Sequence, residues 1–340
     1  MQTIKLKNAV YLRAGYSAVG PLEGKGPLSS YFDYIFKDDK LKEKTFEKAE
    51  RRMLKTIFEN AIDKADLTVD DVEFMFGGDL LNQIVSSSYT ARELKIPFVG
   101  VYSACATMCE SLALASIFVD NGLANNVVAG TCTHFSSAER QYRFPLELGN
   151  QRPPTAQWTI TGGGATVVSN ETSKIKVSAV TFGTVTDYGI NDVNNMGAAM
   201  APAACDTILN HLKNSKRKVS DYDLILTGDL GKLGSEILID LMEYNGIILG
   251  KNYADSGCMM YDKTERVFMG GSGAGCIASV LNSYVIKKLQ TGDFKRVLLV
   301  ATGALMSTTS SQQGDTIPGI AHAVELEFVG WLWQLIFGIM

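Results

Sequence analysis

Hydrophobic positions along the chain come in short apolar runs that alternate with stretches of helical periodicity. The clearest runs are 74–78, 97–102, 127–133 and 224–227, and several end in Gly, Thr or Asp. Short apolar strands separated by helices are typical of mostly parallel sheets that are buried on both faces. The pattern therefore predicts an α/β fold.

The same order of elements occurs twice. Residues 71–80 (DVEFMFGGDL) read like 221–230 (DYDLILTGDL), and 103–133 parallel 272–304 as a small-residue turn, a helix, a corner and an apolar strand. A closing strand follows in each half, at 162–169 and 318–325. Repeats in a matching order indicate internal duplication.

We predict two halves, 1–170 and 171–327, followed by an apolar tail at 328–340. The helix at 106–119 is almost entirely small or apolar, as expected for a helix that is covered on every side. Two mostly parallel sheets that enclose such central helices would form a five-layer αβαβα body.

Composition narrows the function classes. The chain has 340 residues, a net charge of −4 and only three histidines. The acidic balance argues against a nucleic-acid binder, which needs a basic face. Six cysteines without CxxC spacing favour neither a disulfide framework nor a metal site, and they suit a reducing compartment. The N-terminus lacks the order of a signal peptide, so we expect the chain to stay inside the cell.

The tail, FVGWLWQLIFGIM, has no charge and is too short to span a bilayer, which takes about 20 residues. Two interpretations stay open: it packs on the body, or it lies at a membrane interface with Trp331 and Trp333 at headgroup depth.

Cys105 is the candidate for chemistry. It lies in the turn 103–107 between an apolar strand and the buried helix. A helix N-terminus lowers the pKa of a thiol and supplies N–H groups for an oxyanion. The alternative is a small core residue, which is the expected role of the other five cysteines.

A thiol nucleophile also needs a base. His134 ends a strand that the duplication places beside the Cys105 turn, and His322 lies in the second closing strand. His211 lies among polar residues, so we expect it at the surface. The second-half turns carry Asp229 and the glycine run 270–275, whose spacing does not match a dinucleotide-binding motif.

The two halves, the Cys105 turn, the glycine run and the closing strand at 318–325 resemble the thiolase superfamily, whose members move acyl groups through a cysteine at this turn. Longer runs sharpen the resemblance: the chain is similar to the stage V sporulation protein AD family at 77–83, 133–145, 195–204, 226–230 and 320–322.

The second resemblance implies a thiolase-like fold that binds dipicolinic acid (pyridine-2,6-dicarboxylate) and needs no other cofactor. It also implies membrane partners among the other stage V sporulation proteins, peripheral attachment to the spore inner membrane, and uptake of dipicolinate with calcium into the developing spore. Superfamily analogy adds a homodimer. In this family the chain usually stops near residue 327, so the tail is a departure.

The second-half turns also argue against catalysis. Ketoacyl synthases carry a histidine and an asparagine or second histidine there, whereas this chain has Asp229 and Gly270-Gly271. Each missing donor is worth about 100- to 1,000-fold in rate. We therefore expect a non-catalytic binder, with an acyltransferase that uses Cys105 and His134 or His322 as the alternative.

Dipicolinate is a flat dianion, so its pocket needs donors for two carboxylates and an apolar or aromatic wall. We predict no metal-binding residues in the chain itself. Each polar candidate has a structural alternative: Arg140 and Arg143 could pair with Glu139 and Glu147 on a surface loop, and Asp79 or Asn82 could hold a turn. The predicted ligand-binding residues are Asp79, Asn82, Gln83, Cys105, His134, Arg140, Tyr142, Arg143 and His322.

Overall fold

The computed structural model describes residues 2–142, 151–262 and 267–330. The strands are β1 (Gln2–Lys5), β2 (Tyr11–Val19), β3 (Tyr34–Ile35), β4 (Phe74–Gly78), β5 (Phe98–Gly100), β6 (Asn126–Thr133), β7 (Trp158–Thr159), β8 (Gly162–Ser169), β9 (Ile175–Phe182), β10 (Leu224–Thr227), β11 (Tyr253–Asp255), β12 (Gly271–Ser272), β13 (Arg296–Ala304) and β14 (Gly319–Phe328).

The helices are α1 (Phe46–Asp63), α2 (Val85–Leu94), α3 (Thr107–Asp120), α4 (Phe135–Tyr142), α5 (Met196–Ser215), α6 (Gly231–Tyr244), α7 (Ser256–Met260), α8 (Ala274–Val280), α9 (Ile286–Thr291) and α10 (Thr308–Gln312). A π-helical turn, Leu281–Val285, joins α8 to α9.

The strand order confirms the duplication. One half runs β5-β4-β6-β8-β2 and the other runs β11-β10-β13-β14-β9, with the same parallel and antiparallel pairings at matching places. Two pairs between β2 and β9 join the halves, so twelve of the described strands form one large sheet that is folded over, while β7 and β12 pair in a separate two-stranded sheet. The predicted division near residue 170 stays a prediction.

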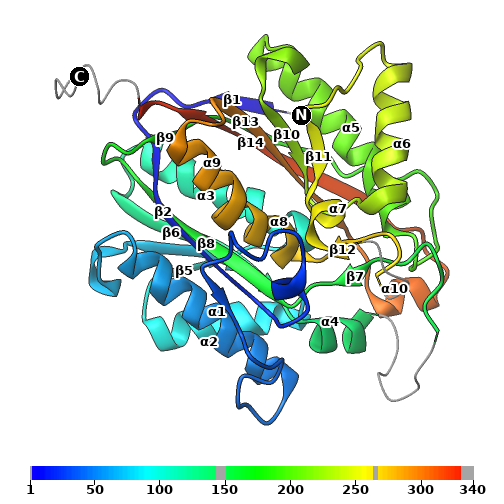
Figure 1. The fold of residues 1–340 in the computed structure, drawn as a ribbon, viewed down its shortest axis with the longest axis horizontal. Helices are drawn as coiled ribbons and strands as arrows, with labels where there is room; N and C mark the ends of the chain where they lie inside the picture. The colour runs from blue at the N-terminus through cyan, green and yellow to red at the C-terminus, as the bar shows by residue number, and fades with distance from the viewer. Residues whose placement is uncertain (1, 143–150, 263–266, 331–340) are drawn as a thin grey trace.

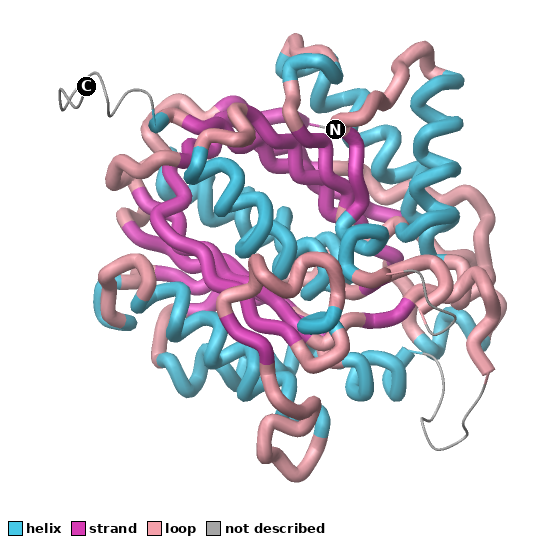
Figure 2. The backbone as a smooth tube through the Cα atoms, in the orientation of Figure 1, coloured by secondary structure: helices cyan, strands magenta, loops and turns pink. Residues whose placement is uncertain are grey.

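Figures 1 and 2 show the five layers. Helices α1 and α2 cover the outer face of the first half-sheet, and α5 and α6 cover that of the second. Helices α3, α8 and α9 lie between the two half-sheets. The structure therefore confirms the predicted thiolase-like arrangement and its buried central helix.

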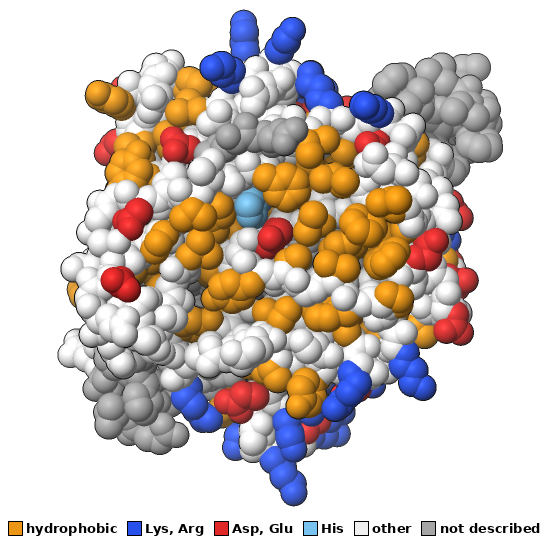
Figure 3. Space-filling model, turned by 180° about the vertical axis from the view of Figure 1, so that it is seen from behind, with side chains coloured by type: hydrophobic (Ala, Val, Ile, Leu, Met, Phe, Trp, Pro, Cys, Tyr) orange, Lys and Arg blue, Asp and Glu red, His pale blue; other side chains and the backbone are white. Residues whose placement is uncertain are grey.

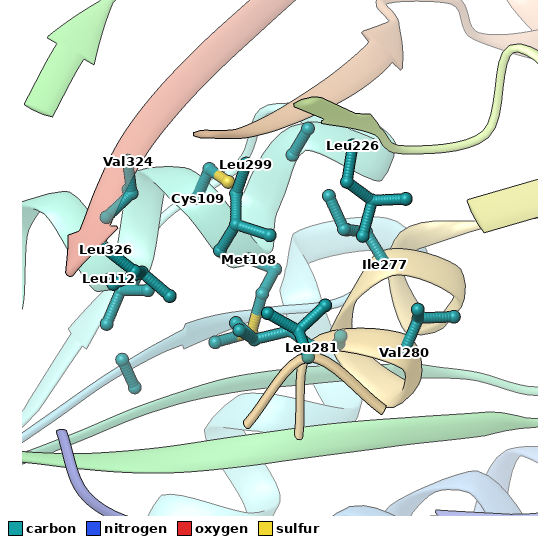
Figure 4. Close-up of a cluster of buried hydrophobic side chains, with 14 of the residues drawn as sticks. Met108, Cys109, Leu112, Leu226, Ile277, Val280, Leu281, Leu299, Val324 and Leu326 are labelled. Atoms are coloured by element: carbon teal, nitrogen blue, oxygen red, sulfur yellow. The ribbon is translucent and has the colours of Figure 1, made fainter. Parts of the chain in front are cut away.

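The central layer holds the main hydrophobic core. Figure 4 shows Met108 and Leu112 of α3 facing Ile277 and Leu281 of the α8 segment, with strand side chains from the second half packed against them. These side chains are almost completely buried. Fully burying one such side chain is worth about 1.5–3 kcal/mol, so this layer ties the halves together.

The central helix α8 approaches β8 so closely that only glycine fits at their contact. A Cβ atom on Gly275 would lie 2.0 Å from the carbonyl oxygen of Gly162. Since that oxygen belongs to the backbone of a central strand, it has little freedom to move. The small residues at the start of α8 are thus required by the layer spacing.

The expectation that His211 lies at the surface is wrong. His211 belongs to α5, and its side chain is buried between this helix and the sheet. It contacts the Thr181 hydroxyl at 2.8 Å, the Tyr222 hydroxyl at 3.1 Å and the Glu325 carboxylate at 3.2 Å. Burial raises the pKa of Glu325, but hydrogen bonds from His211, Tyr222 and Ser178 outweigh it and bring the pKa to about 2. This network fastens α5 to β14.

We expect Gly275→Ala to lower the free energy of unfolding by about 3 kcal/mol, since overpacking a core contact typically costs 1–3 kcal/mol and this one meets backbone. Gly250→Ala is the matched control, because a Cβ there meets only the Asn252 side chain, at 3.3 Å. Urea denaturation measures both. Equal stability of the two variants would contradict the proposed close contact.

Candidate functional site

The Cys105 turn has the predicted form. The chain leaves β5, forms one 3-10 turn at Ala104–Ala106 and enters α3 at Thr107. Ala104 adopts a left-handed φ of 50°, and the Thr107 hydroxyl donates to the Ala104 carbonyl at 2.7 Å. The turn directs Cys105 into a cavity and leaves its side chain almost completely buried.

This cavity is small: its volume is about 40 Å³, whereas sites for drug-sized ligands typically have about 300–1,000 Å³. It lies where both halves meet, because residues of the first half, such as Cys105, share it with residues of the second. Its walls are mostly apolar or aromatic. The lining residues are Leu80, Tyr102, Ala104, Cys105, Ala138, Glu139, Tyr142, Thr159, Met196, Ser272, Gly273, Ala304 and Met306.

Asp229 lies next to the Cys105 thiol and is completely buried. Its carboxylate accepts hydrogen bonds from the Ser272 hydroxyl at 3.0 Å, the Gly273 N–H at 2.8 Å and the Thr302 hydroxyl at 3.0 Å. Burial raises its pKa, which these donors and the Cys105 thiol partly offset. A thiolate at Cys105 would therefore face a buried carboxyl group instead of an imidazole.

Gly273 is required at this point. It has a φ of 104°, and a Cβ would lie 2.9 Å from the Thr133 hydroxyl. The glycine lets the backbone turn its N–H toward Asp229 at the start of α8. The glycine run therefore serves this contact and does not form a nucleotide site.

Glu139 is a second carboxylate at the cavity, and the sequence analysis considered it only as a partner for arginines. It accepts hydrogen bonds from Thr159 at 2.9 Å and from Arg152 at 3.2 Å. The guanidinium of Arg152 also stacks over Trp158 at 5.0 Å. No local motif marks Glu139, because its partners come from a segment beyond residues 143–150.

Two tyrosines form one wall. The hydroxyls of Tyr102 and Tyr142 are 3.0 Å apart, and Tyr142 also donates to the Leu80 carbonyl. Burial raises the pKa of both phenols, so they stay neutral donors and acceptors. Of the predicted ligand-binding residues that the structure describes, Cys105 and Tyr142 line the cavity.

His134 does not reach the cavity. Its Nε2 atom lies 2.6 Å from the Asp39 carbonyl, Nδ1 accepts from the Ser136 N–H at 3.1 Å, and the ring packs against Phe46. Burial lowers its pKa. Both ring nitrogens are thus used in holding α4 to the segment before α1, which turns the imidazole away from Cys105.

His322 does not line the cavity, but it contacts Ser103, the residue before the lining residues Ala104 and Cys105. Its Nε2 contacts the Ser103 hydroxyl at 3.1 Å, that hydroxyl donates to Glu110 at 2.5 Å, and Nδ1 accepts from the Gly183 N–H at 3.2 Å. Burial lowers the pKa of His322 to about 4. Through Ser103, this neutral imidazole supports the turn that carries Cys105.

The remaining predicted residues are dispersed. Asp79 holds its loop by accepting from the N–H groups of Leu81 and Ser87, at 3.0 and 2.7 Å, which matches its structural alternative. Asn82 and Gln83 line a neighbouring surface groove that shares Tyr102 and Tyr142 with the cavity.

The two predicted arginines have different outcomes. Arg140 forms an exposed ion pair with Glu47 at 3.4 Å. It therefore pairs with an acid, as the structural alternative predicted, but the partner is Glu47 and neither Glu139 nor Glu147. Arg143 lies outside the described residues.

Charge at the cavity comes from carboxylates. Among the lining residues that the structure describes, none is Lys, Arg or His. The described part of the chain also holds no cluster of three or more His, Cys, Asp or Glu side chains placed to bind a metal ion.

Comparisons with known proteins agree with this geometry. The family model described as Stage V sporulation protein AD matches residues 1–327. Stage V sporulation protein AD from Bacillus subtilis (strain 168) is 44% identical over 329 residues, which cover 97% of each chain.

Solved structures share the fold at low identity. Cerulenin-bound OleA from Xanthomonas campestris has a TM-score of 0.62 at 12% identity and covers 96% of this chain and 100% of its own. The 3-oxoacyl-[acyl-carrier-protein] synthase III from Aquifex aeolicus VF5 has a TM-score of 0.55 at 15% identity and covers 96% of this chain and 100% of its own. The Acat5 thiolase from Ascaris suum has a TM-score of 0.59 at 10% identity and covers 95% of this chain and 100% of its own.

We expect Asp229→Asn to increase the rate of Cys105 alkylation by iodoacetamide at pH 8 by about tenfold. Removing a negative charge beside the sulfur favours the thiolate, and one pKa unit is a tenfold change. Peptide-level mass spectrometry separates Cys105 from the other cysteines, and Thr302→Val, which keeps the charge, is the control. An unchanged rate in Asp229→Asn would show that the carboxylate does not restrain the thiol.

His322 should make stability depend on pH. The folded protein keeps the imidazole neutral down to about pH 4, whereas the unfolded chain binds a proton below about pH 6.5. The free energy of unfolding should therefore fall relative to that of His322→Gln by about 3 kcal/mol between pH 6.5 and 4. Urea titrations of both proteins across this range measure the difference, and a constant difference would contradict a neutral His322.

Proposed function

Because this chain belongs to the Stage V sporulation protein AD family, we propose that it is a non-catalytic protein that binds dipicolinic acid in the Cys105 cavity. The observation that carries the proposal is the cavity itself. It occupies the position of an acyl-transfer centre, yet Asp229 stands beside the cysteine.

The walls of the cavity suit a flat aromatic ring. Tyr102 and Tyr142 offer ring faces and neutral hydroxyls, while Met196 and Met306 provide adaptable apolar contact on the side of the second half. A planar ligand needs more room than the cavity has in this arrangement, so it enters when flexible side chains such as Met196 and Met306 turn aside. Its polar groups find hydroxyl and thiol partners near Cys105.

The charge of the cavity bears on the form of the ligand. Asp229 and Glu139 are both carboxyl groups, and Arg152 forms an ion pair with Glu139. A dicarboxylate whose charge is neutralised by calcium meets less repulsion there than a bare dianion does. The calcium chelate of dipicolinate is therefore the ligand form that the charge of this cavity favours.

Several features support the absence of acyl transfer. A cysteine-dependent acyltransferase needs a base for the thiol and free donors for the oxyanion. In the described residues no histidine lines the cavity, and the N–H of Gly273 and the hydroxyl of Ser272 bond to Asp229. The alternative of an active acyltransferase rests on the shared fold of enzymes such as 3-oxoacyl-[acyl-carrier-protein] synthase III.

The proposal extends to the cellular setting. We place the protein at the spore inner membrane as a peripheral, homodimeric member of a complex with other stage V sporulation membrane proteins, where it helps dipicolinate enter the developing spore with calcium. Family membership supports this setting. None of the helices in the described ranges is long and apolar enough to cross a membrane.

Isothermal titration calorimetry with dipicolinate tests the proposal. We expect saturable heat, in the absence or presence of Ca²⁺, and a dissociation constant at least about tenfold higher for Tyr142→Ala, since an aromatic contact plus its buried area exceeds 1.4 kcal/mol. Tyr244→Ala, at a tyrosine that is 90% exposed, is the matched control.

Two outcomes would count against it. If the purified protein gives no saturable heat under either condition, it does not bind dipicolinate. If Tyr142→Ala binds as tightly as the unchanged protein, the ligand occupies another place.

A further inference from the structure

A second surface of interest lies at the far end of α5, away from the cavity. Here the last turn of α5 and the residues after it meet the loop that follows α6, and together they line a groove. We call this surface the basic edge. It comprises Lys213, Lys216, Arg217, Lys218, Tyr244, Ile247, Ile248 and Lys251.

Its apolar side chains are unusually exposed. Tyr244 is 90% and Ile248 is 77% accessible, which are the highest values among the exposed large hydrophobic residues of the described chain. Ile247, beside them, is only partly buried. Exposing large hydrophobic side chains to water is unfavourable. Their grouping at the end of α6 and in the loop after it therefore points to a contact with another surface.

Lysines surround these apolar residues. Lys213, Lys216, Lys218 and Lys251 are exposed, and none has a carboxylate within ion-pair distance in the part of the chain that the structure describes. Figure 3 shows Lys and Arg side chains projecting along its upper edge, which is the side of α5 and α6 in Figure 1. The protein is acidic overall, so this cluster departs from its mean charge.

The acidic groups nearby leave the lysines available. Asp221 bonds to the backbone N–H of Lys218 at 2.8 Å, while Glu325 and Glu327 hold Arg217. Glu243, next to Tyr244, and Asp240, one turn earlier in α6, are exposed acids on the flank of the surface. Lys213 lies in the last turn of α5, where a positive charge is favourable, and this explains its position. The same effect does not explain the positions of Lys251 or of the exposed Ile248.

We propose that the basic edge docks on a bilayer of anionic phospholipids. Ile248 and Tyr244 enter the headgroup region, and the surrounding lysines contact lipid phosphates. The combination of a projecting apolar pair and unpaired cations matches a negatively charged interface that is apolar just below its surface. An acidic protein would suit the lysines but would not require the projecting side chains.

The path of the chain supports this orientation. Arg217 of the basic edge forms an ion pair with Glu327 at 3.0 Å, so the end of β14 lies beside this surface. The sequence then continues from Phe328 as an uncharged apolar run with two tryptophans. The described chain therefore ends near the Arg217 side of the basic edge, on the opposite side from α6 (Figure 1).

This inference rests on the membrane association proposed above, but not on dipicolinate binding. The two can fail separately, because calorimetry with dipicolinate needs no lipid. Recruitment through partner proteins alone would also leave the ligand proposal intact while removing the role of the basic edge.

Vesicle co-sedimentation of the full chain tests the inference. We expect binding to phosphatidylcholine vesicles that contain phosphatidylglycerol, weaker binding as NaCl increases, and little binding to phosphatidylcholine alone. The triple variant Lys213→Gln, Lys216→Gln, Lys218→Gln should lower the partition coefficient by at least about tenfold, since each lysine near an anionic surface contributes measurably. Ile248→Ser should lower it at both low and high salt.

Two controls sharpen the result. Lys37→Gln, Lys42→Gln, Lys44→Gln removes three exposed lysines before α1 and should leave binding unchanged. Thermal melting checks that every variant is folded. A Trp331→Ser, Trp333→Ser variant measures the contribution of the C-terminal run.

The inference is overturned if the full chain ignores anionic vesicles, or if the triple variant binds as well as the unchanged protein. It is also overturned if the tryptophan variant abolishes binding while the triple variant and Ile248→Ser retain it, because the C-terminal run then acts without the basic edge. Selective loss in the triple variant and in Ile248→Ser supports it.

Discussion

The buried carboxyl group of Asp229 is the interaction on which the site depends. It follows β10, bonds to the start of α8 through Ser272 and Gly273, bonds to β13 through Thr302, and meets the Cys105 thiol from the other half. A buried carboxylate without such partners would cost several kcal/mol. The donors that satisfy it come from β12, the start of α8 and β13, so one carboxyl group holds these elements together around the Cys105 turn.

The duplication explains how one position acquired two roles. Asp79 and Asp229 follow equivalent strands, β4 and β10, in the two halves. Asp79 binds N–H groups of its own half and closes a loop. Asp229 also bonds within its own half but reaches a cysteine from the other. The difference arises because only the first half presents its central helix through a cysteine-bearing turn.

The sequence predicted the elements well and their side-chain partners less well. The repeated order of strands and helices, the buried α3 and the Cys105 turn followed from periodicity and from the internal repeat, since both depend on local pattern. His134, His211 and Glu139 depended instead on contacts between distant segments, such as Asp39 with His134 and Arg152 with Glu139. A polar neighbourhood in sequence does not show which face of a helix packs inward, and so His211 was misplaced.

One helix connects the cavity to the basic edge. Met196 begins α5 and lines the cavity, while Lys213 lies in its last turn at the proposed lipid contact. At about 1.5 Å per residue, the helix separates these points by roughly 25 Å. The hydrogen bonds of His211 fasten this helix to the sheet, so docking would fix the height of the cavity above the bilayer. If the basic edge docks as proposed, a ligand bound in the cavity would be held above the lipid, and we propose that it passes from there to a protein that rises from the membrane.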